Sequence, residues 1–202
     1  MTTASSTHPK SRGTSRQAII EVSRAIIEDE GLEHLNIRRI AETINRTQPA
    51  VYQHFAGKDE ILSAVVVEGF TALVERLTRA AKGGKPSLTA LAHAYVRFGL
   101  DRPRLYEVMF VGAPAIAFAV DDTPRPAQAA FARFAAAVAE SGLERSKVDT
   151  ATEVVWAALH GLVMLSITQR LRPGRALHRA RVDQLTAAIV AMTEPTDSGR
   201  RP

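Results

Sequence analysis

The helical spacing of apolar residues is the feature that most constrains how this chain folds. From Ser15 onward, apolar side chains recur at intervals that place them on one face of an α-helix. The first two sets are Ile19, Val22 and Ile26, and then Ile37, Ile40, Ala41 and Ile44. Later segments keep the same period, and none shows the alternation of apolar and polar residues that is typical of a strand. The pattern predicts an all-α fold.

Capping residues and helix breakers divide this pattern into separate helices. Ser15 and Asn36 are good N-caps, and Gly31 ends the first helix. Proline and glycine interrupt the later segments. We expect helices over residues 15–31, 36–44, 47–55, 58–82, 87–101, 102–111, 127–141, 146–170 and 178–192.

The second and third of these helices are short and lie close together in the chain. Asn45 tolerates a left-handed conformation, and Thr47 can cap the third helix with Pro49 in its first turn. Two short helices across so tight a turn, supported by a preceding helix, make a helix-turn-helix. The predicted organisation is an N-terminal three-helix domain over 15–60, joined by a long helix to a helical domain over 61–194.

The two ends of the chain and one internal turn have a different composition. Residues 1–14 are rich in Ser, Thr, Pro and Gly and carry Lys10 and Arg12, so we expect a flexible basic arm. Residues 195–202 are expected to form a flexible tail. The Gly-Gly-Lys-Pro turn at 83–86 is the best candidate hinge.

Composition excludes several classes of protein. The 202 residues include no Cys, which rules out disulfides, thiolate zinc sites and cysteine nucleophiles. The N-terminus lacks the apolar core of a signal peptide, and the most apolar run, residues 154–165, falls short of the roughly 20 residues that span a bilayer. The net charge of +5 raises the odds of an anionic partner. We expect a cytoplasmic protein without a membrane partner.

The run IRRIAETINRTQPAVYQHFAGKDEIL, residues 37–62, resembles the DNA-binding signature of TetR-family regulators. It contains an Ile-Ala pair, a turn, a Thr cap, Val-Tyr-x-His-Phe and Lys-Asp-Glu-x-Leu in the family's order. The match extends over about 15–62 and implies a DNA-binding regulator. Two positions depart from the family pattern: Asn45 replaces the usual glycine, and Arg46 replaces an apolar residue that packs under the turn. The stem of Arg46 can cover the core while its guanidinium reaches a phosphate.

The resemblance and the docking of such a motif suggest a role for each exposed residue. The second helix enters the major groove N-terminus first, so Gln48 is placed to read adenine and Pro49 or Ala50 to touch a thymine methyl. Arg38 matches a family position that can reach a guanine. Phosphate contacts are expected from Thr47, Tyr52, His54 and Lys58. The predicted DNA-binding residues are Arg38, Arg46, Thr47, Gln48, Pro49, Ala50, Tyr52, Gln53, His54 and Lys58.

Other interpretations of these residues remain open. Tyr52 can be a half-buried core tyrosine, His54 an exposed cap, and Gln48 an exposed residue that reads no base. Val51 and Phe55 are expected to pack inward.

The segments 95–112 and 154–165 are similar to the WHG-type ligand-binding domain of some TetR-family proteins, named for a set that is Trp156, His160 and Gly161 in this sequence. Trp156 and His160 lie one turn apart on one helix face, and Gly161 permits the close approach of another helix. The predicted ligand-binding residues are Phe98, Tyr106, Met109, Phe110, Phe131, Phe134, Trp156 and His160. The alternative is a packed core with a hydrogen-bonded histidine.

No catalytic or metal-binding motif is present in the sequence. Phosphate-loop, zinc-protease and nucleophile-elbow patterns are missing, so we expect neither an enzyme nor a cofactor. The histidines are scattered without metal-ligand spacing, at His8, His34, His54, His93, His160 and His178. The rival interpretation is a helical enzyme or carrier that uses His160 as a base.

The last two helices, over 147–170 and 178–192, are the expected dimer surface, because the first is apolar nearly all round. A dimer predicts a palindromic operator. The resemblance implies a repressor that a small, largely apolar ligand releases from DNA; an activator or a ligand-independent regulator is the alternative. The Arg-rich segment 170–181 is either a solvated face or a site for an acidic ligand.

Overall fold

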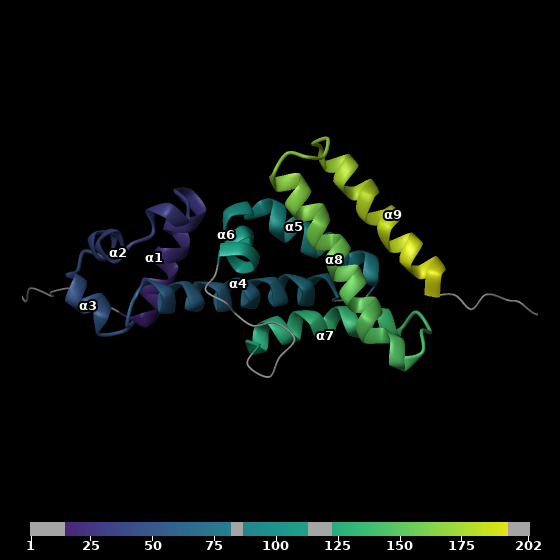
Figure 1. Cartoon of the computed structure of the whole chain (residues 1–202), viewed down its shortest axis with the longest axis horizontal. Coiled ribbons are helices and arrows are strands. Elements are labelled where there is room, and N and C mark those ends of the chain that lie inside the picture. The colour runs from purple at the N-terminus through teal and green to yellow at the C-terminus, as the bar shows by residue number, and fades with distance from the viewer. Residues whose placement is uncertain (1–14, 82–86, 113–122, 194–202) are drawn as a thin grey trace, which may run out of the picture. The chain divides into compact units, whose positions relative to one another are not determined.

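A computed structural model describes residues 15–81, 87–112 and 123–193, and every regular element within these ranges is helical (Figure 1). The chain forms two compact units, divided between Val65 and Val66. The all-α prediction is therefore confirmed. The predicted arm, tail and hinge, at 1–14, 195–202 and 83–86, lie outside the described residues.

The first unit begins with the predicted helices and caps. Its elements are α1 (Arg16–Asp29), the 3₁₀ turn η1 (Leu32–His34), α2 (Ile37–Thr43), α3 (Gln48–Tyr52) and the start of α4 (Lys58–Ala80). The Ser15 hydroxyl accepts the N–H of Ala18 at 3.1 Å, and Asn36 Oδ1 accepts the N–H of Arg39 at 2.8 Å. Gly31, with φ 109°, follows the end of α1. Both N-caps satisfy backbone donors that the first turn of a helix leaves unpaired.

The turn between α2 and α3 has the left-handed residue that the sequence predicts. Asn45 has φ 53°, and the next residue, Arg46, donates its N–H to the carbonyl of Ala41 at 2.8 Å. Thr47 occupies the N-cap position of α3 but makes no side-chain capping bond. Pro49 has no N–H to offer it, and the N–H of Ala50 bonds the backbone carbonyl of Thr47 at 3.0 Å. The predicted side-chain cap at Thr47 is therefore wrong.

Helix α3 is also shorter than predicted, because it ends at Tyr52 and not near Phe55. The N–H of His54 bonds the carbonyl of Val51 at 3.0 Å, which tightens the last turn. Phe55 follows with 1% of its surface exposed. The chain leaves the helix early and turns inward, and this places the Phe55 ring in the core.

The first unit is held together by a small apolar core. The predicted faces of the helices point inward, and its fully buried large side chains are Ile19, Ile27, Leu35, Ile40, Val51, Phe55 and Ile61. Each such side chain contributes about 1.5–3 kcal/mol by leaving water. This core fixes the orientation of a helix as short as α3, which local bonds alone cannot stabilise.

The Lys-Asp-Glu sequence at the start of α4 closes the first unit. Glu60 Oε2 accepts the N–H of Ala56 at 2.8 Å, which resembles the reciprocal bond of a capping box. The guanidinium of Arg16 lies 4.5 Å from the centre of the Phe55 ring and 3.7 Å from Glu60 Oε1. The chain after α3 is thus attached both to α1 and to the first turn of α4.

The second unit contains the rest of α4 and five further helices. They are α5 (Leu88–Asp101), α6 (Pro103–Glu107), which continues into the π-helical η2 (Val108–Gly112), α7 (Arg125–Ala139), α8 (Val148–Ile167), which follows the turn η3 (Arg145–Lys147), and α9 (Arg175–Thr193). Helix α8 packs against both α5 and α7, and α9 packs against α5 and α8. In Figure 1 these helices run from blue α4 through green α8 to yellow α9.

Two helix starts differ from the prediction. Helix α7 begins at Arg125 and not at Ala127, because Pro126 lies in its first turn, where a missing N–H costs nothing. Helix α9 begins at Arg175 and not at His178, directly after Gly174 with φ 131°. Pro126 therefore lies inside the start of α7, whereas Gly174 lies just before the start of α9.

The predicted helix over 102–111 is split into α6 and η2. A π-helical segment changes the direction in which successive side chains point, and such segments are frequent at functional sites. Here it carries Met109, which is buried, and Phe110, which is partly exposed.

The close helix approach expected at Gly161 occurs at Gly99 instead. A Cβ at Gly99 would lie 2.4 Å from Val163 Cγ1 and 3.0 Å from Tyr106 Cδ2, so α5 meets α8 and α6 where it has no side chain. A Cβ at Gly161 would meet no described atom of the chain within 4 Å. The missing side chain of Gly161 serves no contact within the described part of the chain.

One apolar helix is largely uncovered. The segment Arg145–Ile167 is long and apolar enough to cross a membrane by length and composition alone. A helix that packs against another protein chain passes the same test. Most of this segment is not buried within a single chain.

Candidate functional site

Helix α3 of the first unit presents its polar side chains to solvent. Gln48, Pro49 and Gln53 are exposed, and 53% of the Tyr52 surface is exposed. Tyr52 is therefore not a core residue. Val51 and Phe55 lie on the apolar side of the segment, and both are buried, as predicted.

The remaining predicted DNA-binding residues surround α3. Ala50 and His54 are partly exposed, and Thr47 and Lys58 are exposed at the starts of α3 and α4. Arg46 is exposed in the turn, where its Nη1 donates to the carbonyl of Asn45 at 3.0 Å. Arg46 thus adds a cation beside the N-terminus of α3, in place of the apolar residue usual in the family.

Arg38 on α2 is held by an acidic neighbour. Its Nε donates to Glu42 Oε1 at 2.8 Å, one helical turn away, and this hydrogen bond raises the pKa of Arg38 above its usual value. Both side chains are exposed. To bond a guanine, the guanidinium must share or exchange this carboxylate partner, and an exposed pair of this kind is weak enough to exchange.

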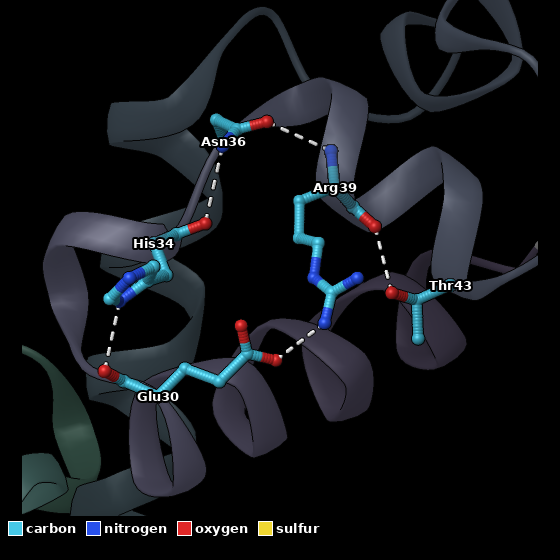
Figure 2. A network of polar contacts seen from close by, with 5 residues as sticks. All are labelled: Glu30, His34, Asn36, Arg39 and Thr43. Carbon is cyan, nitrogen blue, oxygen red and sulfur yellow. Dashed lines mark hydrogen bonds and ion pairs between the residues drawn. The ribbon is translucent and has the colours of Figure 1, made fainter.

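A polar network fixes the start of α2 against the end of α1 (Figure 2). Arg39 Nη2 lies 2.7 Å from Glu30 Oε1, and this hydrogen bond raises the pKa of Arg39. The Asn36 amide donates to the carbonyl of His34 at 3.2 Å. The Thr43 hydroxyl donates to the carbonyl of Arg39 at 2.8 Å. The pairing of Glu30 with Arg39 is not predicted from the sequence, because it joins residues of different helices and helical periodicity gives no sign of it.

The second unit contains a cavity of about 550 Å³. Aromatic rings supply much of its wall, and polar groups enter from α7, from α8 and from Thr123, two residues before α7. Its lining residues are Phe70, Leu73, Tyr95, Phe110, Thr123, Ala127, Gln128, Ala130, Phe131, Phe134, Asp149, Glu153 and Trp156. A cavity of this size and composition fits a small organic molecule.

Half of the predicted ligand-binding residues line this cavity. Those that do are Phe110, Phe131, Phe134 and Trp156, and those that do not are Phe98, Tyr106, Met109 and His160. Phe98, Tyr106 and Met109 are fully buried core residues. Phe70, Leu73 and Tyr95 also line the cavity and are not predicted from the sequence, because they belong to apolar helix faces and give no local signal of a cavity. Asp149 and Glu153 are not predicted either, although Glu153 stands one turn before Trp156.

A chain of hydrogen bonds leads from the cavity wall into the core. Trp156 Nε1 donates to the Tyr95 hydroxyl at 2.9 Å, and this hydroxyl lies 2.7 Å from that of Tyr106. The Tyr106 hydroxyl lies 2.8 Å from His160 Nδ1. Burial raises the pKa of both tyrosines and lowers the pKa of His160. When His160 is neutral and its Nδ1 accepts the hydrogen bond from Tyr106, the hydroxyl protons of both Tyr95 and Tyr106 have acceptors.

Phe110 joins this hydrogen-bonded chain to the cavity. Its ring centre lies 5.4 Å from that of Phe70, 5.0 Å from that of His160 and 6.0 Å from that of Trp156. Such spacings are favourable for aromatic pairs. The π-helical geometry of η2 places this ring against the cavity while the neighbouring Met109 packs beside Gly69.

Two family models match the chain. One describes bacterial regulatory proteins of the tetR family and matches residues 19–65, which contain the helix-turn-helix. The other describes a tetracyclin repressor-like C-terminal domain and matches residues 88–192, more than half of the chain. The chain belongs to the TetR family. It is a transcriptional regulator with a helix-turn-helix DNA-binding domain.

Curated relatives of this TetR-family protein are also regulators. It is 26% identical over 158 residues to the uncharacterized HTH-type transcriptional regulator Rv0681 of Mycobacterium tuberculosis, covering 76% of this chain and 71% of that one. It is 27% identical over 97 residues to the uncharacterized regulator YobS of Bacillus subtilis, covering 47% of this chain. That match spans about half, 51%, of the YobS length.

Solved structures share the fold. A Rhodococcus protein of unknown function superposes with a TM-score of 0.76 at 21% identity, covering 93% of this chain and 99% of that one. BioQ, solved with its double-stranded DNA operator, gives 0.64 at 20% identity, covering 88% and 99%. A TetR variant from Acinetobacter baumannii, solved with minocycline, gives 0.65 at 18% identity, covering 90% and 99%. At these identities the likeness concerns the fold alone.

Proposed function

We propose that this TetR-family protein is a homodimeric repressor that binds a palindromic operator and is released from it by a small organic ligand. DNA binding is assigned to residues 15–60, and ligand binding with dimerisation to 61–194. The observation that carries the proposal is the extent of helix α4 along the chain. This single helix begins at Lys58, next to the recognition segment, and supplies Phe70 and Leu73 to the cavity wall.

The proposed ligand acts through α4. A molecule in the cavity contacts Phe70 and Leu73, and a shift of their helix carries its first turn at Lys58 with it. Release from DNA requires the ligand to bind one position of α4 more tightly than the other, because only a difference in affinity moves such an equilibrium. The BioQ complex with DNA and the TetR complex with minocycline are consistent with both binding activities in proteins of this fold.

The proposed DNA contacts divide into base readers and phosphate contacts. Gln48, Pro49 and Ala50 at the N-terminus of α3 are assigned to base edges, together with Arg38. Arg46, Thr47, Tyr52, Gln53, His54 and Lys58 are assigned to the DNA backbone. The exposure of the polar members supports this assignment.

The proposed dimer surface is centred on a stripe of α8 formed by Val154, Ala157, Gly161 and Leu165, in which Gly161 is partly exposed and the other three are exposed. These residues recur every three or four positions, so they share one helix face. Val154 is 60% exposed and Leu165 is 46% exposed, which is unusual exposure for apolar side chains in so apolar a helix. A second copy that packs on the α8 stripe removes this surface from water.

Two rival functions are less well supported. An activator, or a regulator without a ligand, shares the DNA-binding residues, and reporter output after gene deletion separates these from a repressor. An enzyme or carrier that uses His160 as a base is disfavoured, since His160 does not line the cavity and its Nδ1 lies 2.8 Å from the Tyr106 hydroxyl. We propose no enzymatic activity and no cofactor, and a site of action in the cytoplasm.

Selection of bound duplexes from a random DNA pool tests the proposal directly. With the purified protein at physiological salt, we expect enrichment of a palindrome whose half-sites lie about one helical turn, roughly 34 Å, apart. A protein that is folded but enriches no sequence, or only a single half-site, contradicts dimeric sequence-specific binding.

Arg46→Val tests whether the unusual turn residue contacts a phosphate. We expect weaker binding to the selected duplex, and a slope of log affinity against log salt that is smaller by about one, because one fewer counterion is released. Arg79→Val, which removes an exposed arginine from the last turn of α4, is the matched control and should leave the slope unchanged. An unchanged slope for Arg46→Val contradicts the phosphate contact.

A further inference from the structure

We propose that the cavity of the second unit binds a lipophilic organic cation. This rests on the proposed function, since it names the chemical class of the ligand that the cavity accepts. The sequence predicts a largely apolar ligand, and the residues of the cavity wall indicate that this ligand also carries a positive charge.

The aromatic part of the wall suits a cation. Six rings line the cavity, and they come from α4, α5, η2, α7 and α8, so that they approach it from several directions: Phe70, Tyr95, Phe110, Phe131, Phe134 and Trp156. The face of an aromatic ring is negative and attracts an ammonium or phosphonium group, most strongly where water is excluded. The same rings bury the hydrocarbon portion of such a molecule.

The charged residues described in the cavity wall are all acidic. Among the described residues that line the cavity, Asp149 and Glu153 are the charged ones, and neither Lys nor Arg is in the lining. The two carboxylates lie one turn apart on α8, so they share a face, and Glu153 stands one turn before the Trp156 ring. Both are exposed, which places them where the cavity opens to solvent.

Helix capping explains only one of these carboxylates. Asp149 lies in the first turn of α8, where a negative charge favours the helix without any ligand. Glu153 lies one turn further along, beyond the range of that effect. Its carboxylate belongs to the cavity wall one turn before Trp156, where it would attract a cation.

The overall charge of the protein predicts the opposite preference. The chain carries a net charge of +5 and attracts anions in general. Arg125 and Arg133 belong to α7, next to the cavity, but they are not in its lining. A preference for cations can therefore come only from the residues of the cavity wall. Because the net charge of the protein favours anions, a measured preference for a cation would identify the effect of the wall.

The test uses two probes of nearly the same shape and opposite charge, tetraphenylphosphonium and tetraphenylborate. Trp156 is the single tryptophan of the chain and lines the cavity, so its fluorescence reports binding without a label. We expect the phosphonium to bind at least about tenfold more tightly than the borate, as a ring-lined acidic site predicts. Equal affinities, tighter binding of the borate, or no binding of the phosphonium would overturn the proposal.

Charge-removing variants identify the residues responsible. Glu153→Gln should lower phosphonium affinity several-fold, and the double variant Asp149→Asn with Glu153→Gln should bring the preference for the cation close to that set by the rings alone. Both positions are exposed, so the fold should tolerate the changes. Glu75→Gln is the matched control, because Glu75 is an exposed acid of α4 outside the cavity lining. If Glu75→Gln and Glu153→Gln lower phosphonium affinity equally, the effect comes from the net charge of the protein and the proposal is overturned.

The binding measurement is independent of the regulatory function. It is made on the protein without DNA, so a failure of the cation site leaves the duplex selection unaffected. The phosphonium is then added to the complex with the selected duplex. Binding of the cation without release of DNA supports the site and contradicts the proposed ligand-released repressor.

Discussion

Gly161→Arg is expected to convert the protein from a dimer to a monomer. An arginine in the middle of the α8 stripe places a charge where we propose that a second copy packs, and an unpaired buried charge at an interface is strongly unfavourable. Sedimentation at micromolar concentration should show a single-chain mass of 21.9 kDa for the variant. Affinity for the palindromic duplex should fall by about 100-fold or more, because the two half-sites are no longer bound together.

The single chain has room for this substitution. A Cβ at Gly161 meets no described atom within 4 Å, and its backbone is helical, so the arginine side chain can extend into solvent. Ala132→Arg on α7 is the control, since it adds the same side chain at an exposed position outside the proposed interface. Leu165→Lys tests the same stripe one turn further on. If both stripe variants remain dimers, or if the unaltered protein is a monomer, α8 is not the dimer surface.

Gly99→Ala is expected to destabilise the second unit by about 1–3 kcal/mol, the usual cost of overpacking a core. The new methyl group would lie 2.4 Å from Val163 Cγ1, and Val163 and Tyr106 are fully buried, so neither can move aside freely. Replacing glycine by alanine in a helix otherwise stabilises it by up to about 1 kcal/mol. The steric conflict should outweigh this gain. Urea unfolding at one fixed protein concentration measures the difference, because the proposed dimer would make stability depend on concentration.

Removing the opposing side chain provides the control. Val163→Ala deletes the Cγ1 atom that the new methyl group would strike. The double variant Gly99→Ala with Val163→Ala should therefore be more stable than the sum of the two single changes predicts, as expected for residues in direct contact. A stabilised Gly99→Ala, or strict additivity, would show that α5 and α8 do not approach each other so closely.

The caps and the turn of the helix-turn-helix could be predicted because their causes are local. Ser15 and Asn36 bond backbone N–H groups three residues away, and Asn45 takes a left-handed conformation that its own side chain tolerates. The exposure of α3 with Val51 buried follows from spacing within one helix. Such features depend on few neighbours, so the order of the residues is enough to recognise them.

The errors came where two local rules compete. Thr47 is a good cap by type, but the N–H three residues on, that of Ala50, bonds the backbone carbonyl of Thr47, and Pro49 offers no N–H in its place. Pro126 was read as a helix breaker, and it is a first-turn proline of α7. Residue type alone does not say which rule applies, because each depends on where the helix begins.

The helical class of this protein, its helix-turn-helix and its membership of the TetR family can all be recognised from the order of its residues. Packing between helices selects the aromatic side chains that face a cavity, and it places Tyr106 and His160 in a buried hydrogen-bonded chain and Glu153 in the cavity wall. It also placed the close helix contact at Gly99 and left Gly161 open. The physical reason is that spacing along a helix fixes which residues share a face, whereas the neighbour that covers that face is chosen by packing between helices distant in the sequence.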